Sequence, residues 1–410
     1  MSLKEFFSPK SVAVVGASHT PSKIGYVIFE NFVKGGYSGM VYGVNPNTEP
    51  ILGKKIYSSI LDIPSSIDLA VIAVPAQAVP SILGHCAKKK VKAVVIISGG
   101  FSEIGKEGSA LEEKCKKIIK RNKMCVLGPN CIGVYDAFSK VDTLFLAPKR
   151  LTRPGAGKIA FISQSGAVGS VLLDCLAAEG IGISRFISYG NAIDVNASNL
   201  IEYLAKDGKT KVVVSYLEGV KDGREFLKVA KKVSNKKPII VLKAGKTSKG
   251  VKAVSSHTGS LAGVAEIYSG VFKQAGVIEA QNWEELFDIA KALAYQPKLK
   301  GKKLAILTNG GGFGVLATDA VEKAGLESPE PSAKLKKIFK KNFPAHAAFK
   351  NPIDLTGDAD SERYKIALET CLKSKEFDGI LLILLFQTPT LEANVIDTVA
   401  ELNKKYKKPI

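Results

Sequence analysis

A histidine set among small residues offers the most distinctive chemistry in this sequence. Residues 255–263 read Ser-Ser-His-Thr-Gly-Ser-Leu-Ala-Gly, and His257 is one of only 4 histidines. Small neighbours leave an imidazole uncrowded, hydroxyl groups can fix its tautomer or bind a phosphoryl oxygen, and glycines let a loop bend. The pattern predicts either a reactive histidine that moves during a reaction or an ordinary histidine in a surface loop after the basic residues 243–252.

Two segments of small residues could bind anions. Residues 158–174 align without a gap with residues 303–319, and each segment passes from an apolar stretch through small residues into a helical pattern. Free N–H groups at a helix N-terminus attract phosphate, and small side chains let it approach. The candidate phosphate-binding residues are Ser163, Gln164, Ser165, Gly166, Ala167, Thr308, Asn309, Gly310, Gly311 and Gly312.

The carboxylate of Glu218 directly follows another apolar stretch, residues 211–217. An acid at the carboxyl end of a strand is either a solvated turn residue or part of a site. A carboxylate that accepts a hydrogen bond from one ring nitrogen of a histidine would leave the other nitrogen free to attack phosphorus.

A hydrolase with Ser165 as its nucleophile is disfavoured. Residues 163–167 lack both outer glycines of the G-x-S-x-G motif, and no triad order is evident.

Apolar stretches of strand length alternate with helical patterns along the whole chain. The first of them lie at residues 12–15, 41–44, 69–74, 93–97 and 124–127. Continuous apolar strands are buried on both faces, and helix-length connections require parallel pairing, so residues 1–130 predict a Rossmann-like α/β domain. Such a sheet binds ligands at the carboxyl ends of its strands. The G-x-G-x-x-G spacing is missing and no acid follows the second stretch, which disfavours an NAD(P)-dependent oxidoreductase.

The remainder of the chain contains an internal repeat. Residues 191–194 resemble residues 351–354, and the apolar stretches 212–217 and 380–386 follow in the same order. Several matching elements in succession indicate two copies of one α/β unit. We therefore expect a linker over residues 131–157, a domain containing the histidine over 158–298, and a second copy over 301–410. This second copy is expected to be truncated, because Lys-Lys-Pro-Ile at 236–239 leads into a strand whereas the same residues at 407–410 are the last in the sequence.

Composition narrows the class of protein. The chain has 410 residues, 46% hydrophobic and 23% charged, and neither a targeting segment nor an apolar run of membrane length is evident. Its 6 cysteines lack metal-ligand spacing, which predicts a cytoplasmic protein without disulfides or metal in this chain. The net charge of +20 is spread along the sequence without aromatic interleaving. It indicates small anionic ligands and a heat-adapted, lysine-rich surface rather than nucleic acid.

The histidine stretch, Ser-His-Thr-Gly-Ser-x-Ala-Gly, resembles the phosphohistidine loop of the NDP-forming acyl-CoA synthetases, the superfamily of succinyl-CoA synthetase and the ADP-forming acetyl-CoA synthetases. Residues 74–75, 98–103 and 128–133 resemble loops of its CoA-binding domain. The resemblance spans essentially the whole chain. It implies a Rossmann-like CoA-binding domain followed by two flavodoxin-like (succinyl-CoA synthetase-like) domains. The CoA-binding residues that it implies are Gly16, Ser18, Val44, Asn45, Pro46, Pro75, Ser98, Gly99, Gly100, Gly128, Pro129 and Asn130.

The resemblance also implies a reaction. The chain would be the α part of an ADP-forming acetyl-CoA (acyl-CoA) synthetase, a ligase that reversibly converts acyl-CoA, ADP and phosphate into acid, CoA and ATP through an acyl phosphate. His257 would carry the phosphoryl group and Glu218 would hydrogen-bond it, while Asp194 and Asp354 would define the fold or support the site. A non-catalytic CoA-binding regulatory protein is the alternative.

No ATP-grasp domain and no G-x-x-x-x-G-K-[ST] loop is recognised in the sequence. ADP or ATP and its Mg²⁺ are therefore expected on a β subunit or a C-terminal part with an ATP-grasp fold, in a homo- or hetero-oligomer. The sequence leaves open the acyl group, the choice between ADP and GDP, and the direction of the reaction in the cell.

Overall fold

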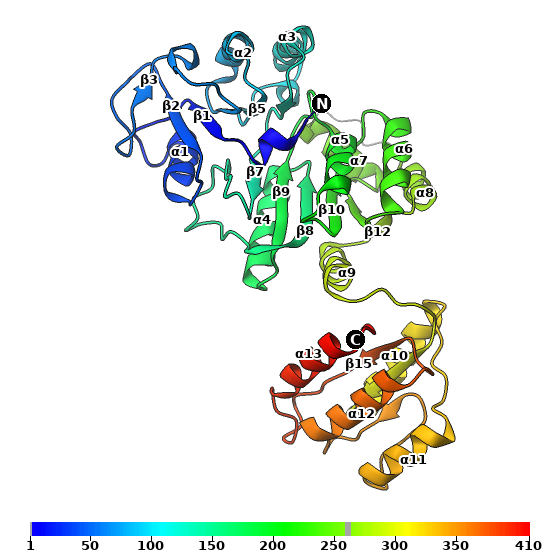
Figure 1. Ribbon diagram of the computed structural model, residues 1–410. Helices are drawn as coiled ribbons and strands as arrows, with labels where there is room; N and C mark the ends of the chain where they lie inside the picture. Colours follow the sequence, from blue (N-terminus) through cyan, green and yellow to red (C-terminus); the bar gives the residue numbers. More distant parts are fainter. Residues whose placement is uncertain (1, 259–263) are drawn as a thin grey trace. The chain divides into compact units, whose positions relative to one another are not determined.

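The computed structural model describes residues 2–258 and 264–410, except for the side chains of residues 255–258. The chain divides into two compact units, Met1–Ala294 and Tyr295–Ile410. The first unit contains two six-stranded sheets and the second unit a three-stranded sheet. This α/β architecture with parallel sheets is the one that the sequence predicted (Figure 1).

The first sheet has the strand order β3-β2-β1-β4-β5-β6, and all of its pairs are parallel. Its central strands are buried along their whole length, as expected for Val- and Ile-rich strands covered on both faces. The two-residue edge strand β3 was not predicted. The strands are β1 (Ser11–Val15), β2 (Met40–Val44), β3 (Ile56–Tyr57), β4 (Leu69–Ile72), β5 (Ala93–Ile96) and β6 (Val126–Leu127).

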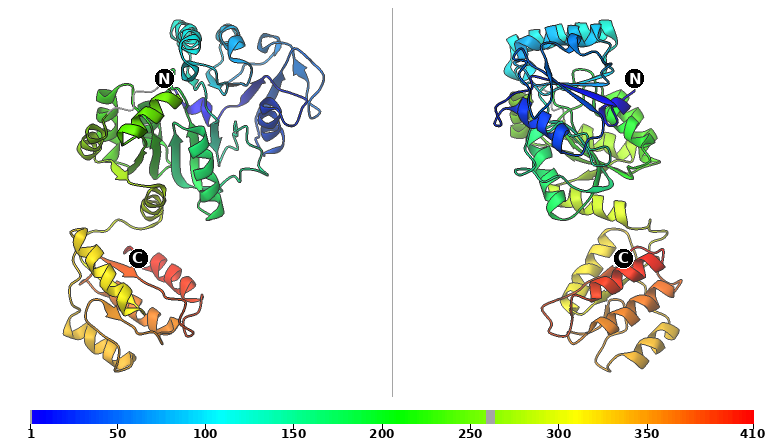
Figure 2. Two further views of the ribbon diagram at one scale, coloured as in Figure 1. Left: turned by 180° about the vertical axis from the view of Figure 1, so that it is seen from behind. Right: turned by 60° about the vertical axis from the view of Figure 1, so that its left-hand side comes forward.

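Helices cover both faces of this sheet. Alternate residues of β1 face opposite sides, so Val12 and Val14 pack towards α1 whereas Ala13 and Val15 pack towards α2 and α3. Figure 2 shows α2 and α3 in cyan on one side of the sheet and α1 in blue on the other. The helices are α1 (Ile24–Lys34), α2 (Val79–Lys88) and α3 (Lys106–Asn122), with short 3₁₀ turns η1 (Lys4–Phe6), η2 (Ile60–Asp62), η3 (Ala76–Ala78) and η4 (Ser102–Ile104).

The second sheet has the order β12-β11-β10-β8-β9-β7. Strand β7 pairs antiparallel with β9, so part of the predicted linker 131–157 is an edge strand of this sheet. The linker prediction is wrong there, because the short apolar stretch of β7 pairs with a strand that lies much later in the sequence. The strands are β7 (Gly133–Asp136), β8 (Ala156–Ser163), β9 (Ile183–Ser188), β10 (Val212–Leu217), β11 (Ile239–Lys243) and β12 (Ile278–Ala280).

One hydrophobic core runs through both sheets of the first unit. It joins residues of β1 and α1 to residues of β8, α5, α6 and α8, while a separate core packs α4 and α9 against the other face of the second sheet. The two predicted domains therefore form a single compact unit. The helices are α4 (Gly166–Ala178), α5 (Ala197–Lys206), α6 (Gly223–Ser234), α7 (Ser248–Thr258), α8 (Ala265–Ala275) and α9 (Trp283–Tyr295).

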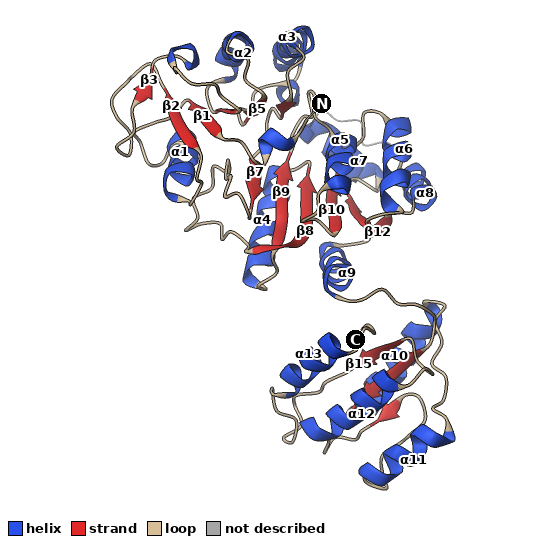
Figure 3. Cartoon of the chain, in the orientation of Figure 1, coloured by secondary structure: helices blue, strands red, loops and turns tan. Residues whose placement is uncertain are grey.

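The second unit has a parallel sheet of the order β14-β13-β15 (Figure 3). Leu307 of β13 faces the core formed with α11, α12 and α13, and its neighbour Ile306 faces α10. The strands are β13 (Leu304–Thr308), β14 (Ile353–Asp354) and β15 (Gly379–Leu382). The helices are α10 (Gly311–Lys323), α11 (Ala333–Asn342), α12 (Ser361–Lys373) and α13 (Val395–Lys405).

Candidate functional site

Most of the predicted CoA-binding residues line one cavity at the carboxyl edge of the first sheet. The cavity has a volume of about 800 Å³, which is the size of a small-molecule or cofactor site. The predicted residues that line it are Gly16, Ser18, Val44, Asn45, Pro46, Pro75, Ser98 and Gly99. Lys23, Ser58, Ser59 and His85 also line it and were missed. Nothing in their sequence surroundings shows that they share one cavity, so only the fold reveals it.

Close contact between two glycines shapes the wall of this cavity. Gly16 has a φ of +94°, and a Cβ atom on Gly25 would lie 1.8 Å from the Gly16 carbonyl oxygen. A larger residue at either position would strain the backbone or push α1 away from the end of β1. The glycines of this α/β unit therefore let helix and strand approach closely, although their spacing differs from the dinucleotide motif.

The remaining predicted CoA-binding residues do not line this cavity. Gly128 and Pro129, joined by a cis peptide bond, precede Asn130 at the junction between the two sheets of the first unit. The Asn191 N–H donates to the Pro129 carbonyl oxygen at 3.0 Å, and Asn191 Nδ2 donates to Glu103 Oε2 at 2.7 Å.

Glu103, the partner of Asn191, also holds the loop that borders the cavity. Glu103 Oε1 accepts hydrogen bonds from the N–H groups of Gly100 at 2.6 Å and Phe101 at 3.1 Å. Asn191 therefore connects this loop to the second sheet. The sequence indicated Asn191 only as a member of the repeat.

Residues 163–167 form the N-terminal end of α4, as the sequence predicted. Ser165 Oγ accepts a hydrogen bond from the Val168 N–H at 3.3 Å, which makes Ser165 the N-cap of the helix. Gln164 has a different role: its Oε1 accepts hydrogen bonds from the N–H groups of Glu218 at 2.9 Å and Gly219 at 3.0 Å. Its side-chain oxygen therefore holds the turn after β10, and its backbone N–H donates to the Tyr216 carbonyl oxygen at 3.2 Å.

Glu218 is buried, with 3% of its surface exposed, so it is not a solvated turn residue. Its carbonyl oxygen accepts a hydrogen bond from Lys243 Nζ at 2.8 Å, and Lys243 is also 3% exposed. Burial lowers the pKa of Lys243, and the charge of Glu218 partly offsets this effect. Burial and the charge of Glu218 together raise the pKa of Tyr216 to about 12. The adjacent carboxyl ends of β10 and β11 thus hold an acid and a lysine that are both withdrawn from solvent.

The backbone of His257 lies in the last turn of α7, where the sequence predicted a loop. Residues 251–257 contain neither glycine nor proline, so nothing in this segment interrupts a helix. Helix α7 lies in contact with η4, next to the loop that borders the cavity. The rest of the predicted histidine stretch, residues 259–263, lies outside the described residues, as do the side chains of residues 255–258.

In the second unit, residues 308–312 form the corresponding end of α10. Asn309 Oδ1 accepts a hydrogen bond from the Leu385 N–H at 2.8 Å, and Asn309 Nδ2 donates to the Leu385 carbonyl oxygen at 3.1 Å. Gly310 is the N-cap of α10 and supplies no capping side chain. Asp354 lies beside this helix end, since a Cβ atom on Gly311 would be 2.9 Å from Asp354 Oδ2.

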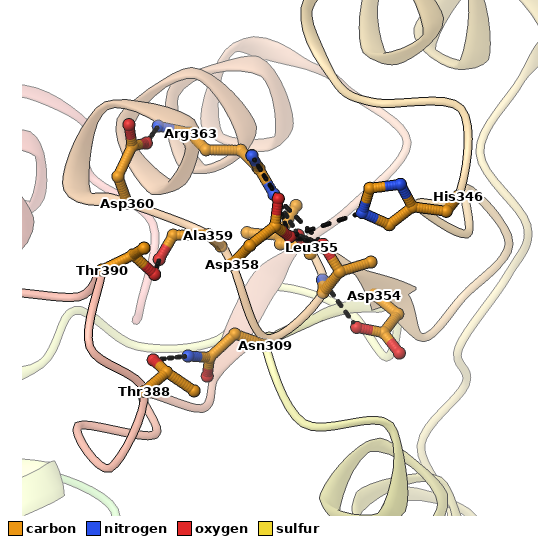
Figure 4. Close-up of polar contacts among 11 residues, drawn as sticks. Asn309, His346, Asp354, Leu355, Asp358, Ala359, Asp360, Arg363, Thr388 and Thr390 are labelled. Atoms are coloured by element: carbon orange, nitrogen blue, oxygen red, sulfur yellow. Dashed lines mark hydrogen bonds and ion pairs between the residues drawn. The ribbon is translucent and has the colours of Figure 1, made fainter.

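A cluster of polar side chains follows Asp354 (Figure 4). Thr356 has a φ of +70°, a strained value for a β-branched residue. Arg363 of α12 holds this turn, because its Nη1 donates to the Leu355 carbonyl oxygen at 2.8 Å and to Asp358 Oδ1 at 2.9 Å. Hydrogen bonds from Arg363 and then Thr356 keep the pKa of Asp358 well below its usual range. Sequence reasoning selected Asp354 but neither Thr356 nor Arg363.

Family models match all three α/β regions of the chain. Residues 10–137 match a CoA binding domain, residues 156–293 a succinyl-CoA ligase like flavodoxin domain, and residues 304–405 a ligase-CoA domain. Two of these regions correspond to the first unit and one to the second. Fold and site together therefore define a CoA ligase of the succinyl-CoA synthetase type.

Relatives and solved structures identify the family more narrowly. The chain is 44% identical, over 100% of its length and 89% of the relative's, to the α subunit of acetate–CoA ligase [ADP-forming] I from Pyrococcus furiosus. It is 42% identical to acetate–CoA ligase [ADP-forming] I from Archaeoglobus fulgidus, where the match covers 96% of this chain and 56% of that protein.

A structure of dinucleotide forming acetyl-coenzyme A synthetase 1 from Ca. Korarchaeum cryptofilum, in complex with phosphate and ADP, superposes with a TM-score of 0.92. It is 38% identical, over 99% of this chain and 88% of that one. The chain belongs to the family of ADP-forming acetate–CoA ligases and resembles their α subunits. It is a ligase that forms carbon–sulfur bonds, as the sequence predicted.

In the part of the chain that the structure describes, no helix is long and apolar enough to cross a membrane. The same residues contain no group of three or more His, Cys, Asp or Glu side chains that could hold a metal ion.

Proposed function

We propose that this chain binds acyl-CoA in the cavity of the first sheet and carries a phosphoryl group on His257. The proposal includes the predicted site residues: Glu218 as the hydrogen-bonding partner of His257, and the N-terminal ends of α4 and α10 as phosphate-binding sites. The position of α7 against η4 supports it, because the helix that carries His257 then lies next to the loop at the cavity. Mg²⁺ and ADP or ATP would bind to a partner with an ATP-grasp fold.

Each step of the proposed reaction is a substitution at carbon or phosphorus. A phosphate oxygen attacks the thioester carbonyl carbon, the carbon–sulfur bond breaks, and CoA leaves as the thiolate. A nitrogen of His257 then attacks the phosphorus of the acyl phosphate, and the carboxylate of the acid leaves. Finally, a terminal oxygen of ADP attacks the phosphohistidine phosphorus and the imidazole leaves, giving ATP. The covalent relay divides a difficult transfer into easier steps.

The observation that carries this proposal is the buried carboxylate of Glu218. Burying an ionised carboxylate is costly, so a fold that keeps one buried must hold it in a specific environment. The repeat provides an internal control, because Val213 pairs with Pro238 in the way that Ile380 pairs with Pro409, which aligns Glu218 with Leu385. The same α/β unit therefore folds with an apolar residue at this position, so its fold does not require the carboxylate.

The nucleotide-binding partner lies outside this chain. The α-subunit relatives are named as subunits, so a second polypeptide or a fused part is required for the complete enzyme. We propose that it has the ATP-grasp fold. The cysteines in the described structure are free, and a reducing cytoplasm is the compartment that we propose.

The test is to incubate the assembled enzyme with labelled phosphate and acetyl-CoA. A phosphoramidate is labile in acid and stable in base, so label on this chain should be lost in acid and absent from the His257→Ala variant. CoA binding should persist in that variant, because its cavity lies on the first sheet. Label that survives the substitution would contradict the assignment of His257. Tight CoA binding without any label on the wild-type chain would favour a non-catalytic CoA-binding protein.

A further inference from the structure

We propose that Lys243 is a positioning residue for the phosphohistidine step, which fixes the turn carrying Glu218 and supplies a buried positive charge beside it. This inference rests on the proposed function and names a residue that the sequence did not select. Lys243 is the last residue of β11, next to the carboxyl end of β10.

The turn at residues 218–220 is held by side chains from several elements. Gln164 accepts hydrogen bonds from the N–H groups of Glu218 and Gly219. Tyr268 of α8 accepts a hydrogen bond from the Val220 N–H at 3.0 Å through its hydroxyl oxygen. Lys243 Nζ donates to the carbonyl oxygens of Glu218 and Ala244. Successive backbone groups of the turn are therefore fixed before any substrate binds, as a preorganised site requires.

The turn of the second copy is held by an amide side chain in the same way. Leu385, which occupies the position of Glu218, also donates its N–H to an amide side chain, here Asn309. Its carbonyl oxygen, however, accepts from the neutral donors Asn309 Nδ2 at 3.1 Å and Thr388 Oγ1 at 2.9 Å. A neutral donor is sufficient for the turn. In the first copy Lys243 supplies the donor instead, so the carbonyl oxygen beside the buried carboxylate is bound by a cation.

The surroundings of Lys243 favour its charged form in some respects and oppose it in others. Its ammonium lies 4.5 Å from the centre of the Tyr268 ring, an arrangement that stabilises a cation. Burial opposes the charge, and the negative charge of Glu218 supports it. A phosphorylated imidazole would add further negative charge near Glu218. A fixed buried cation would stabilise that charge more strongly than a solvated one.

Lys237 offers a matched control at the opposite end of the same strand segment. Its Nζ also donates to two backbone carbonyl oxygens, those of Leu204 and Asp207. Burial lowers the pKa of Lys237 as it does that of Lys243. Lys237 precedes β11 at the amino edge of the sheet, away from the carboxyl edge that carries Glu218. Lys237 is only partly buried, but it makes the same kind of contact at the edge of the sheet away from the proposed chemistry.

The experiment compares Lys243→Gln, Lys243→Arg and Lys237→Met in the assembled enzyme. Quenched-flow experiments with acetyl phosphate that carries a radioactive phosphorus atom measure the rate of His257 phosphorylation. Titration calorimetry measures CoA affinity, and scanning calorimetry measures thermal unfolding. Lys243→Gln retains a donor but loses the charge, so phosphorylation should slow by about 10²-fold while CoA affinity is unchanged. Lys243→Arg should restore most of the rate. Lys237→Met should lower the unfolding temperature without slowing phosphorylation.

The outcomes separate the inference from the function on which it rests. If wild-type enzyme acquires no acid-labile label, the proposed function fails. If wild-type enzyme is labelled and Lys243→Gln reacts at the wild-type rate, the inference fails while the function stands. Equal slowing in Lys237→Met and Lys243→Gln would also overturn it, since it would reveal a general loss of stability. Should a Lys243 variant be unfolded at the assay temperature, the rates are compared at a lower temperature where calorimetry shows all variants folded.

Discussion

The two copies of the repeat have the same backbone at the carboxyl edge of their sheets but different side chains. In each copy an amide side chain after the first strand, Gln164 or Asn309, accepts an N–H from the residue that follows a neighbouring strand. That residue is the buried acid Glu218 in the first copy and Leu385 in the second. The shared hydrogen bond is therefore a feature of the common fold, and the buried carboxylate of the first copy is an addition to it.

The loops containing Asp194 and Asp354 show the same divergence. Asp194 Oδ2 accepts a hydrogen bond from the Val126 N–H at 2.8 Å, which links the second sheet to the first. Asp354 Oδ1 accepts the Thr356 N–H at 2.9 Å within its own loop, and four residues more than in the first copy separate it from the following helix. One aspartate therefore joins two sheets, whereas the other shapes a local turn.

The strongest test of this comparison converts the first copy into the second. Glu218→Leu places at the first site the residue that the second copy carries. Because the repeat folds with leucine there, we expect the variant to remain folded but phosphorylation of His257 to slow by roughly 10²-fold or more. Quenched-flow labelling gives the rate and circular dichroism the fold.

Leu385→Val is the matched control, since it changes the equivalent residue without touching the buried charges. It should leave the phosphorylation rate almost unaltered. Wild-type kinetics in Glu218→Leu would mean that the carboxylate has no part in the chemistry, and that the difference between the copies is incidental.

A second test removes what the copies share. Asn309→Leu deletes the acceptor for the Leu385 N–H and leaves that group without its side-chain partner. A lost buried hydrogen bond costs about 1–3 kcal/mol, so the second unit should be destabilised by that amount. Hydrogen exchange in β13 and β15 should report the loss, while CoA binding by the first unit stays unchanged. Asn309→Gln, which retains an amide, is the control; no change in exchange for the leucine variant would show that the shared bond is dispensable.

The smallest expected effect concerns pH. Burial raises the pKa of Asp194, and the bond from the Val126 N–H only partly offsets this. A carboxyl whose pKa is higher in the folded state binds its proton more tightly there, so its contribution to stability falls as pH rises above the ordinary value of about 3.9. Asp194→Asn lacks this penalty and retains an acceptor. Its stability relative to wild type should therefore increase from pH 3 to pH 7.

Urea titrations at several pH values would measure this trend. Asp354→Asn serves as the comparison, because Asp354 bonds within its own loop and not to another sheet. A stability of Asp194→Asn that falls relative to wild type as pH rises would contradict the assigned sign.

Much of the fold and part of the site could be predicted from the sequence. The Val- and Ile-rich stretches located the strands of the first sheet, because buried parallel strands must be apolar on both faces. Small residues after β1, β4 and β5 marked the walls of the cavity, since loops at the carboxyl ends of strands meet at one edge. His85 was missed, because a helical residue gives no local sign of which ligand it faces.

What the sequence determined by itself was the set of local structures and the repeat, because turns, strands and helices depend on neighbouring residues and their periodicity. Tertiary structure alone decided the partners of the charged groups. It buried Glu218 beside Lys243, committed the Gln164 side chain to the turn at 218–219, and brought α7 against η4. These contacts join residues far apart in the chain, and burial, which makes a charge costly and therefore informative, exists only once the strands and helices have packed together.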